Sequence, residues 1–266
     1  MKTVVITGST RGIGRGLADA FVALGCRVMV SGRREAQVAA VVAELNARRS
    51  GSAGGLACDI TQSAQLQDLW DAAVKSFGSV DVWINNAGMS IPRKPLAEAA
   101  PADLRAIVDT NLTGALLANR IVIRAMLAQG GGQIWNMEGF GSNGMTQPGM
   151  VAYGATKRAI NYLIKALQKE VKDTPVQVCT LSPGIVVTDL LVGDYDRDSE
   201  QWAKAKKVLN ILGDTVETVT PWLAERVLAS DKPGAKVAWL TNGKAFRRFM
   251  LAGFNKRDLF ADLPER

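Results

Sequence analysis

A short β-branched segment at residues 2–7 leads directly into the glycine-rich stretch TGSTRGIG, and residues 12–24 then have the apolar spacing of a helix. A strand, a tight glycine turn and a helix N-terminus together receive the pyrophosphate of a dinucleotide. Glycines also mark plain turns, so the position of these glycines between a strand and a helix is what favours a dinucleotide site. The predicted cofactor contacts in this turn are Gly8, Ser9, Arg11, Gly12, Ile13 and Gly14.

The rest of the chain alternates between predicted strands and helices. Apolar or β-branched runs predict strands at 27–31, 55–58, 80–84, 134–137, 176–181 and 236–240, and helical patterns between them include 62–77, 102–129 and 217–229. This alternation predicts an α/β fold: a single-domain Rossmann fold with a doubly wound parallel sheet and helices on both faces. Within the 266 residues we assign 1–243 to that domain, including a mobile substrate lid at about 189–212, and 244–266 to a tail.

Polar residues follow several predicted strands, at the edge where open α/β sheets bind ligands. The second strand ends at Arg33, where an acid would suit NAD and an arginine accommodates the 2′-phosphate of NADP. We therefore expect NADP, with Arg33 joined by Arg34 or Arg11 on the phosphate; solvated surface arginines are the alternative. The other predicted cofactor contacts are Asp59, Ile60, Asn86, Ala87, Gly88, Pro183, Gly184, Val186 and Thr188.

Tyr153 and Lys157 are the candidate proton-transfer pair, because residues four apart on a helix lie on one face. A free tyrosine has a pKa of about 10, and a nearby lysine ammonium can lower it by roughly 1–3 units. Tyr153 would then exchange a proton near pH 7; the pair alone could equally be a coincidence of spacing. The chain contains no histidine. That excludes Ser-His-Asp triads and histidine-ligated metals, and we expect no metal at the site.

Asn111 lies inside the long predicted helix at 102–129. Asparagine is a poor residue in a helix interior and can break the backbone hydrogen-bond ladder locally. It is therefore either an exposed helix residue or one with a particular role.

Taken together and in order, these motifs resemble the short-chain dehydrogenase/reductases. The matching pieces are TGSTRGIG at 7–14, Asp59, NNAG at 85–88, Asn111, Tyr153-x-x-x-Lys157 and the PG at 183–184. The resemblance implies a sheet of about seven strands, a nicotinamide against the Tyr–Lys helix and a homotetramer or homodimer. It also implies that Tyr153 is the general acid, that Lys157 holds the nicotinamide ribose, and that Asn111 keeps a water chain to Lys157.

Within that family the stretches VWINNAG, IWNMEGFGSNG, YGATK, SPGIVVTDLL and WLTNGK are similar to the chlorophyll(ide) b reductases. The resemblance implies NADPH-dependent reduction of the 7-formyl group of chlorophyll b to a 7-hydroxymethyl group. Most short-chain reductases carry a serine pair where this chain has Glu138 and Gly139. The serine that polarises the carbonyl would then be Ser142, eleven residues before Tyr153; alternatively Ser142 is a plain loop residue, and Glu138 could shape the pocket.

The tail, KAFRRFMLAGFNKRDLF at 244–260, mixes aromatic and basic residues at helical spacing: Phe246, Phe249, Met250 and Phe254 beside Arg247, Arg248, Lys256 and Arg257. A basic amphipathic helix can lie on an anionic membrane or cover a large apolar substrate. It can equally dock on the core or on a sister subunit. The net charge of +7 favours anionic ligands or surfaces, but the basic residues are otherwise dispersed, so we expect no nucleic acid partner.

The expected location is the bacterial cytoplasm. No apolar run approaches the length of a bilayer span, and Cys26, Cys58 and Cys179 are isolated, which favours reduced thiols. Some plant chlorophyll b reductases carry a membrane segment or a long inserted helix that this sequence lacks, which favours a compact bacterial form. A tail that binds lipid would place it peripherally at a photosynthetic membrane.

Three functions remain open at this point. The first is reduction of chlorophyll(ide) b, a hydrophobic tetrapyrrole, with NADPH. The second is reduction of another hydrophobic carbonyl compound, because a fold does not fix a substrate. The third is a non-catalytic dinucleotide-binding sensor or assembly protein. Asn111, Tyr153 and Lys157 count against the sensor, and IWNMEG counts against the generic reductase.

Overall fold

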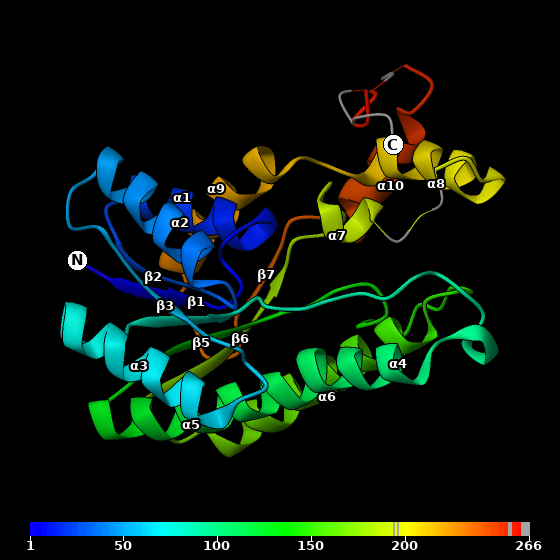
Figure 1. Ribbon diagram of the computed structural model, residues 1–266. Coiled ribbons are helices and arrows are strands. Elements are labelled where there is room, and N and C mark those ends of the chain that lie inside the picture. The colour runs from blue at the N-terminus through cyan, green and yellow to red at the C-terminus, as the bar shows by residue number, and fades with distance from the viewer. Residues whose placement is uncertain (194, 196, 255–256, 262–266) are drawn as a thin grey trace.

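A seven-stranded parallel sheet forms the centre of the protein (Figure 1). The computed structural model describes residues 1–193, 195, 197–254 and 257–261, so Lys256 and residues 262–266 of the predicted tail lie outside the described part. The strand order is β3-β2-β1-β4-β5-β6-β7. The strands are β1 (Thr3–Ile6), β2 (Arg27–Gly32), β3 (Ala53–Ala57), β4 (Val82–Asn85), β5 (Gly132–Met137), β6 (Val176–Ser182) and β7 (Lys236–Ala238). The predicted doubly wound Rossmann fold is confirmed, with its topological switch between β1 and β4.

Helices cover both faces of the sheet (Figure 1). The helices are α1 (Gly12–Ala23), α2 (Glu35–Arg48), α3 (Ser63–Phe77), α4 (Pro101–Val108), α5 (Gly114–Gln129), α6 (Val151–Glu170), α7 (Asp189–Val192), α8 (Glu200–Leu212), α9 (Val216–Leu228) and α10 (Asn242–Met250). One apolar layer packs α1, α2 and α9 on the sheet and the other packs α3, α5 and α6. Because both faces are covered, a strand such as β1 is apolar along almost its whole length and fully buried.

Asn111 interrupts the long predicted helix. It lies in a π-helical turn, Asp109–Thr113, that joins α4 to α5. Its side chain is only 3% exposed, and its amide clamps the backbone of Met89: Met89 N donates to Asn111 Oδ1 and Asn111 Nδ2 donates to Met89 O, both at 2.8 Å. The alternative of an exposed helix asparagine is therefore wrong. Such π turns are frequent at functional sites.

One helix is longer and more apolar overall than the apolar runs in the sequence indicate. The continuous helical segment Pro101–Gln129 is long and apolar enough to cross a bilayer by length and composition alone. Its apolar residues do not form an uninterrupted run, which is why the sequence did not reveal it. In the fold, Ala118, Val122 and Met126 pack into the apolar layer beneath the sheet, as in the core helix of a globular domain, and core helices pass the same test of composition.

The predicted lid at 189–212 consists of α7 and α8 and has an apolar cluster of its own. Trp202 packs between Tyr195 and Phe260. Its ring centroid lies 5.2 Å from that of Tyr195, in a tilted arrangement, and 5.1 Å from that of Phe260, edge to face. The lid stands with α10 above the carboxyl edge of the sheet, opposite α4 and α6 (Figure 1). Its motion stays a prediction.

Candidate active site

A cleft of about 2010 Å³ runs along the carboxyl edge of the sheet. Pockets for one small molecule usually measure about 300–1,000 Å³, so this cleft has room for a dinucleotide and a second molecule. It is lined by all the predicted cofactor and catalytic residues except Ser9 and Asn111. Ser9 is buried beneath the turn, where its hydroxyl donates to Ile6 O at 2.8 Å and accepts from Ser31 N at 2.9 Å. It fixes the turn to β2 and does not line the cleft.

The glycine turn after β1 packs tightly against the neighbouring backbone. Gly8 has a φ of +64°, and a Cβ there would lie 2.9 Å from Ala87 Cα. A Cβ on Gly14 would lie 2.3 Å from Gly8 O. The Asn86 amide holds the turn by donating to Thr7 O and Gly8 O. Helix α1 begins without a side-chain cap, so its first N–H groups fit a pyrophosphate.

The three arginines predicted to bind a phosphate all line the cleft. Arg33 and Arg34 are exposed and line the cleft. Among the residues that the structure describes, no carboxylate lies within ion-pair distance of either. Arg11 lies 3.7 Å from Asp189 in an exposed pair. Asp59 also lines the cleft, with its Oδ1 accepting from Thr61 N and Oγ1 at 3.0 and 2.9 Å.

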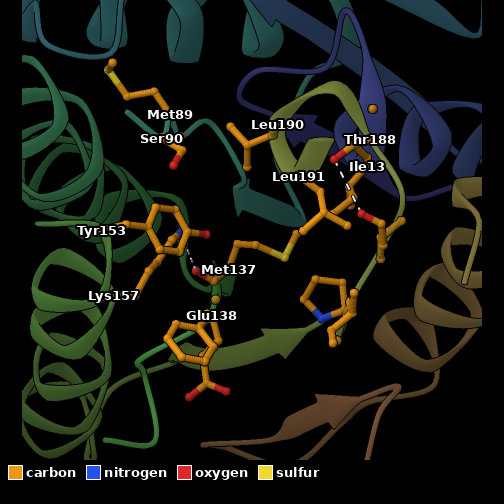
Figure 2. Close-up of a pocket in the computed structure, with 18 of the residues that line it drawn as sticks. Ile13, Met89, Ser90, Met137, Glu138, Tyr153, Lys157, Thr188, Leu190 and Leu191 are labelled. Carbon is orange, nitrogen blue, oxygen red and sulfur yellow. Dashed lines mark hydrogen bonds between the residues drawn. The ribbon is translucent and has the colours of Figure 1, made fainter. Parts of the chain in front are cut away.

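Tyr153 and Lys157 lie side by side on α6 at the floor of the cleft (Figure 2). Lys157 Nζ is 5.8 Å from the Tyr153 ring centroid and donates to Met137 O at 3.3 Å. Burial lowers the pKa of Lys157 to about 8, and the negative charge of Glu138 opposes that lowering. Lys157 is therefore largely an ammonium at neutral pH, although it is only 7% exposed.

Glu138 is a buried carboxylate with two partners. Its Oε2 lies 2.7 Å from Lys236 Nζ, and its Oε1 accepts from Asn161 Nδ2 at 3.0 Å. These contacts satisfy a charge that would be costly to bury alone. Sequence reasoning left Glu138 as a residue that could shape the pocket and missed Lys236 and Asn161, which lie 98 and 23 positions away.

Ser142 closes the glycine-rich loop after β5. Its Oγ accepts from Gly139 N at 3.1 Å, and the backbone N–H of Ser142 donates to Gly139 O. The residue is 3% exposed and lines the cleft with Tyr153. Its hydroxyl proton has no acceptor among the described residues.

Beneath the cleft, a cavity of about 10 Å³ is lined by polar atoms of Asn111, Lys157, Thr7 and Asn136, among others. That volume is about the space one water needs. Asn111 Oδ1 and Lys157 Nζ both lie near Gly88, at 3.3 and 3.9 Å from the position of a Cβ on that glycine. Asn111 thus lies next to Lys157 but outside the main cleft.

The wall of the cleft opposite Tyr153 was predicted from the sequence only in part, through the lid at 189–212. Leu190 and Leu191 lie across the cleft from Tyr153 (Figure 2), and Met89 also lines the cleft. Arg93 lies over the Tyr195 ring at 4.1 Å. Leu190 and Leu191 belong to α7, within the predicted lid and the SPGIVVTDLL stretch. Met89 and Arg93 stand in a loop without a motif, and the sequence did not indicate them.

A dinucleotide turn and a Tyr–Lys pair at one carboxyl edge define an oxidoreductase that uses a nicotinamide cofactor and acts on CH–OH or C=O groups. The comparisons with known proteins agree. The family model described as short chain dehydrogenase matches residues 2–198, and the chain belongs to that family.

Several relatives carry the name chlorophyll(ide) b reductase. The chain is 36% identical to chlorophyll(ide) b reductase NOL, chloroplastic, of Arabidopsis thaliana, over 92% of this chain and 72% of that protein. It is 37% identical to the probable chlorophyll(ide) b reductase NYC1, chloroplastic, of the same plant, over 90% of this chain. The chain spans about half of that second relative (51%). The resemblance read from the motifs is confirmed.

Solved structures of the same fold contain a nicotinamide cofactor. A 7α-hydroxysteroid dehydrogenase complexed with NADH and 7-oxo glycochenodeoxycholic acid has a TM-score of 0.77 at 26% identity, covering 91% of this chain and 93% of that one. A 3-ketoacyl-(acyl-carrier-protein) reductase from Brucella melitensis complexed with NADH has a TM-score of 0.76 at 26% identity, covering 90% and 96%.

Proposed function

We propose that this protein reduces the 7-formyl group of chlorophyll(ide) b to a 7-hydroxymethyl group with NADPH. The observation that carries the proposal is the position of Tyr153 and Lys157 in a cleft of about 2010 Å³ whose far wall is apolar. A tetrapyrrole aldehyde is large and apolar, and the relatives named chlorophyll(ide) b reductase align over nine-tenths of the chain.

The residues around the cleft fit the cofactor. The glycine turn and the N-terminus of α1 would hold the pyrophosphate, Asp59 the adenine side, and Asn86 and Gly88 the ribose. NADPH supplies a hydride when it is bound. Arg33 supports NADP over NAD, because it is a cleft residue without a carboxylate partner among the described residues, and a 2′-phosphate offers that partner.

Tyr153 would donate its proton to the aldehyde oxygen as negative charge develops there, and Ser142 would donate a second hydrogen bond to the same oxygen. The Lys157 ammonium stabilises the resulting tyrosinate and holds the nicotinamide ribose. It then passes a proton back to the Tyr153 oxygen. The small polar cavity between Lys157 and Asn111 has room for a water that would continue this path.

Reduction of another bulky carbonyl compound is the second candidate. A solved structure of similar fold holds a 7-oxo steroid acid, and the apolar wall of this cleft has no feature that is selective for a tetrapyrrole alone. This candidate uses the same Tyr153, Lys157 and Ser142.

We also propose that the protein is a homo-oligomer. Helices α5 and α6 expose Leu116, Leu127 and Tyr162 to solvent, at 46%, 44% and 76%. Exposed apolar side chains on neighbouring helices are typical of subunit interfaces. Sedimentation velocity of the purified protein tests this directly.

The test of the proposed activity is anaerobic incubation of the protein with chlorophyllide b and either NADPH or NADH, with chromatography of the pigments. We expect a 7-hydroxymethyl product that forms faster with NADPH. Absence of that product from a protein that binds NADPH would contradict the substrate and leave the second candidate, which a panel of hydrophobic aldehydes and ketones then tests.

A further inference from the structure

Helix α10 docks on the body of the protein by its basic side. Arg248 forms a two-point ion pair with Asp214, at 2.8 and 3.0 Å, and donates to Leu212 O at 2.9 Å. Lys244 Nζ lies 3.1 Å from the centre of the Trp239 ring. In an ordinary surface helix the apolar stripe faces the core and the charges face water. The arrangement in α10 is the reverse.

The opposite side of α10 and the turn after it expose large apolar side chains. We call these residues the α10 apolar face: Phe246, Phe249, Met250, Leu251 and Phe254, which are 69%, 50%, 66%, 47% and 91% exposed. Scattered apolar residues on a surface need no explanation, but a group of this size marks an interaction site. Phe249 also lines the cleft beside Ala245, so the α10 apolar face continues the wall of the cleft outward.

Positive charge outweighs negative charge on α10 and beside it. Arg248 and Arg257 pair with the one buried carboxylate, Asp214, while Lys244 lies near both arginines and Arg247 is exposed. Burial lowers the pKa of Lys244, and the nearby arginines lower it further, which reflects the local excess of cations. Such a surface attracts an anionic one.

Charge also decides between two occupants of the face. A second copy that docked through the same face by two-fold symmetry would bring two of these cation clusters into one interface, and like charges in an interface are costly. A bilayer with anionic lipids suits both features. Its acyl region accepts the aromatic side chains, and its headgroups attract the excess positive charge, to which the exposed Arg247 contributes.

We propose that the α10 apolar face docks on the surface of an anionic lipid bilayer. This inference does not depend on the identity of the substrate. Because the face continues into the wall of the cleft, docking would place the mouth of the cleft at the lipid surface, where an apolar substrate could enter without crossing water.

Flotation of the full-length protein with vesicles tests the proposal without any measurement of activity. The vesicles are phosphatidylcholine alone, or phosphatidylcholine with phosphatidylglycerol. The variants are Phe246→Ser with Phe254→Ser, Arg247→Gln, and the control Leu24→Ser, which alters a 42% exposed leucine at the end of α1. Neither Phe246 nor Phe254 lines the cleft.

We expect the wild-type protein and Leu24→Ser to float with the anionic vesicles and not with phosphatidylcholine alone. The double phenylalanine variant should lose about tenfold or more in vesicle affinity, and Arg247→Gln should bind more weakly and with less dependence on salt. No flotation of the wild type, or equal flotation of the double variant, would overturn the proposal. So would a change of oligomeric state in the double variant, measured by sedimentation velocity, because a second copy would then be the occupant.

Discussion

Gly139 leaves the space that the Tyr153 hydroxyl occupies: a Cβ at position 139 would lie 2.5 Å from Tyr153 Oη and 3.1 Å from Lys157 Cε. The resemblance to the short-chain reductases predicts a serine pair at the end of β5. This chain has Glu138 and Gly139 at those two positions. Restoring a serine to this chain would therefore not restore the family's usual site. It would displace the Tyr153 hydroxyl, which we propose is the proton donor.

The first prediction is that Gly139→Ser lowers kcat about a hundredfold, because a misplacement of about 1 Å at the reacting centre can cost that much. Thermal stability should change little, since the Tyr153 hydroxyl lies at the end of its side chain and can move into the cleft. The control is Gly154→Ala on α6, the helix that carries Tyr153. The nearest atom to a new Cβ there is 4.0 Å away. Equal turnover of Gly139→Ser and wild type would contradict the placement of Tyr153 as the proton donor.

The second prediction concerns pH. Burial lowers the pKa of Lys157 to about 8 against the opposing charge of Glu138, so the ammonium, and with it kcat/KM, should decline as the pH rises through about 8. Glu138→Gln removes the charge that favours the ammonium, and the decline should then begin at lower pH. Lys236→Met breaks the 2.7 Å ion pair but keeps the Glu138 carboxylate. In this variant kcat/KM should therefore decline over the same pH range as in the wild type. Identical pH profiles for Glu138→Gln and Lys236→Met would refute this role of Glu138.

The same shift has a consequence for stability. The pKa of Lys157 is lower in the folded protein than its ordinary value of 10.5, so between about pH 8 and 10.5 the unfolded chain binds the extra proton. The contribution of Lys157 to the free energy of unfolding therefore rises with pH across that window. Urea denaturation at pH 8 and pH 10 should show a smaller rise for Lys157→Met than for the wild type.

A further prediction concerns the choice of cofactor. Arg33→Ala should raise KM for NADPH roughly tenfold to a hundredfold, because it removes a charge-assisted hydrogen bond to the 2′-phosphate. KM for NADH should stay nearly unchanged. Arg120→Ala, an exposed arginine on α5, serves as the control for a lost positive charge. Parallel changes in KM for both cofactors would place Arg33 away from the 2′-phosphate.

The clamp of Asn111 on Met89 can be separated from its position beside Lys157. Asn46 clamps the backbone of Ala53 in the same way, at 2.9 and 3.0 Å, on the far side of the sheet from Lys157. Asn111→Ala and Asn46→Ala should each lower the free energy of unfolding by about 1–3 kcal/mol, since each leaves backbone groups without partners. Only Asn111→Ala should also lower kcat. If both variants keep full turnover, Asn111 has only a structural role.

Much of the fold could be predicted because its signals are local. The strands are buried on both faces and read as apolar runs, and the glycine turn after β1 stands within a few residues of the helix that it opens. Asn111 was visible as a residue that conflicts with its helix, and the conflict is resolved by a π turn. Local patterns of this kind need no knowledge of distant contacts.

The rest depends on contacts between distant parts of the chain. The partner of Glu138 is Lys236 on the last strand, and no spacing in a single sequence indicates such a pair. Ser9 belongs to the glycine motif, but its side chain points beneath the loop. There it forms hydrogen bonds with Ile6 of β1 and Ser31 of β2. The periodicity of the tail indicated an amphipathic helix, but the helix ends at Met250, before Phe254 and Arg257. Only the ion pair of Arg248 with Asp214 shows which side of α10 faces the body.

The most direct measurement of the central claim is a single turnover of chlorophyllide b with NADPH that carries deuterium at both C4 positions, followed by mass spectrometry of the pigment. The account predicts one deuterium on the new hydroxymethyl carbon with the wild-type protein. Tyr153→Phe should bind the same NADPH and form no labelled product above background. A hydroxymethyl product without deuterium, or equal labelling by Tyr153→Phe, would contradict it.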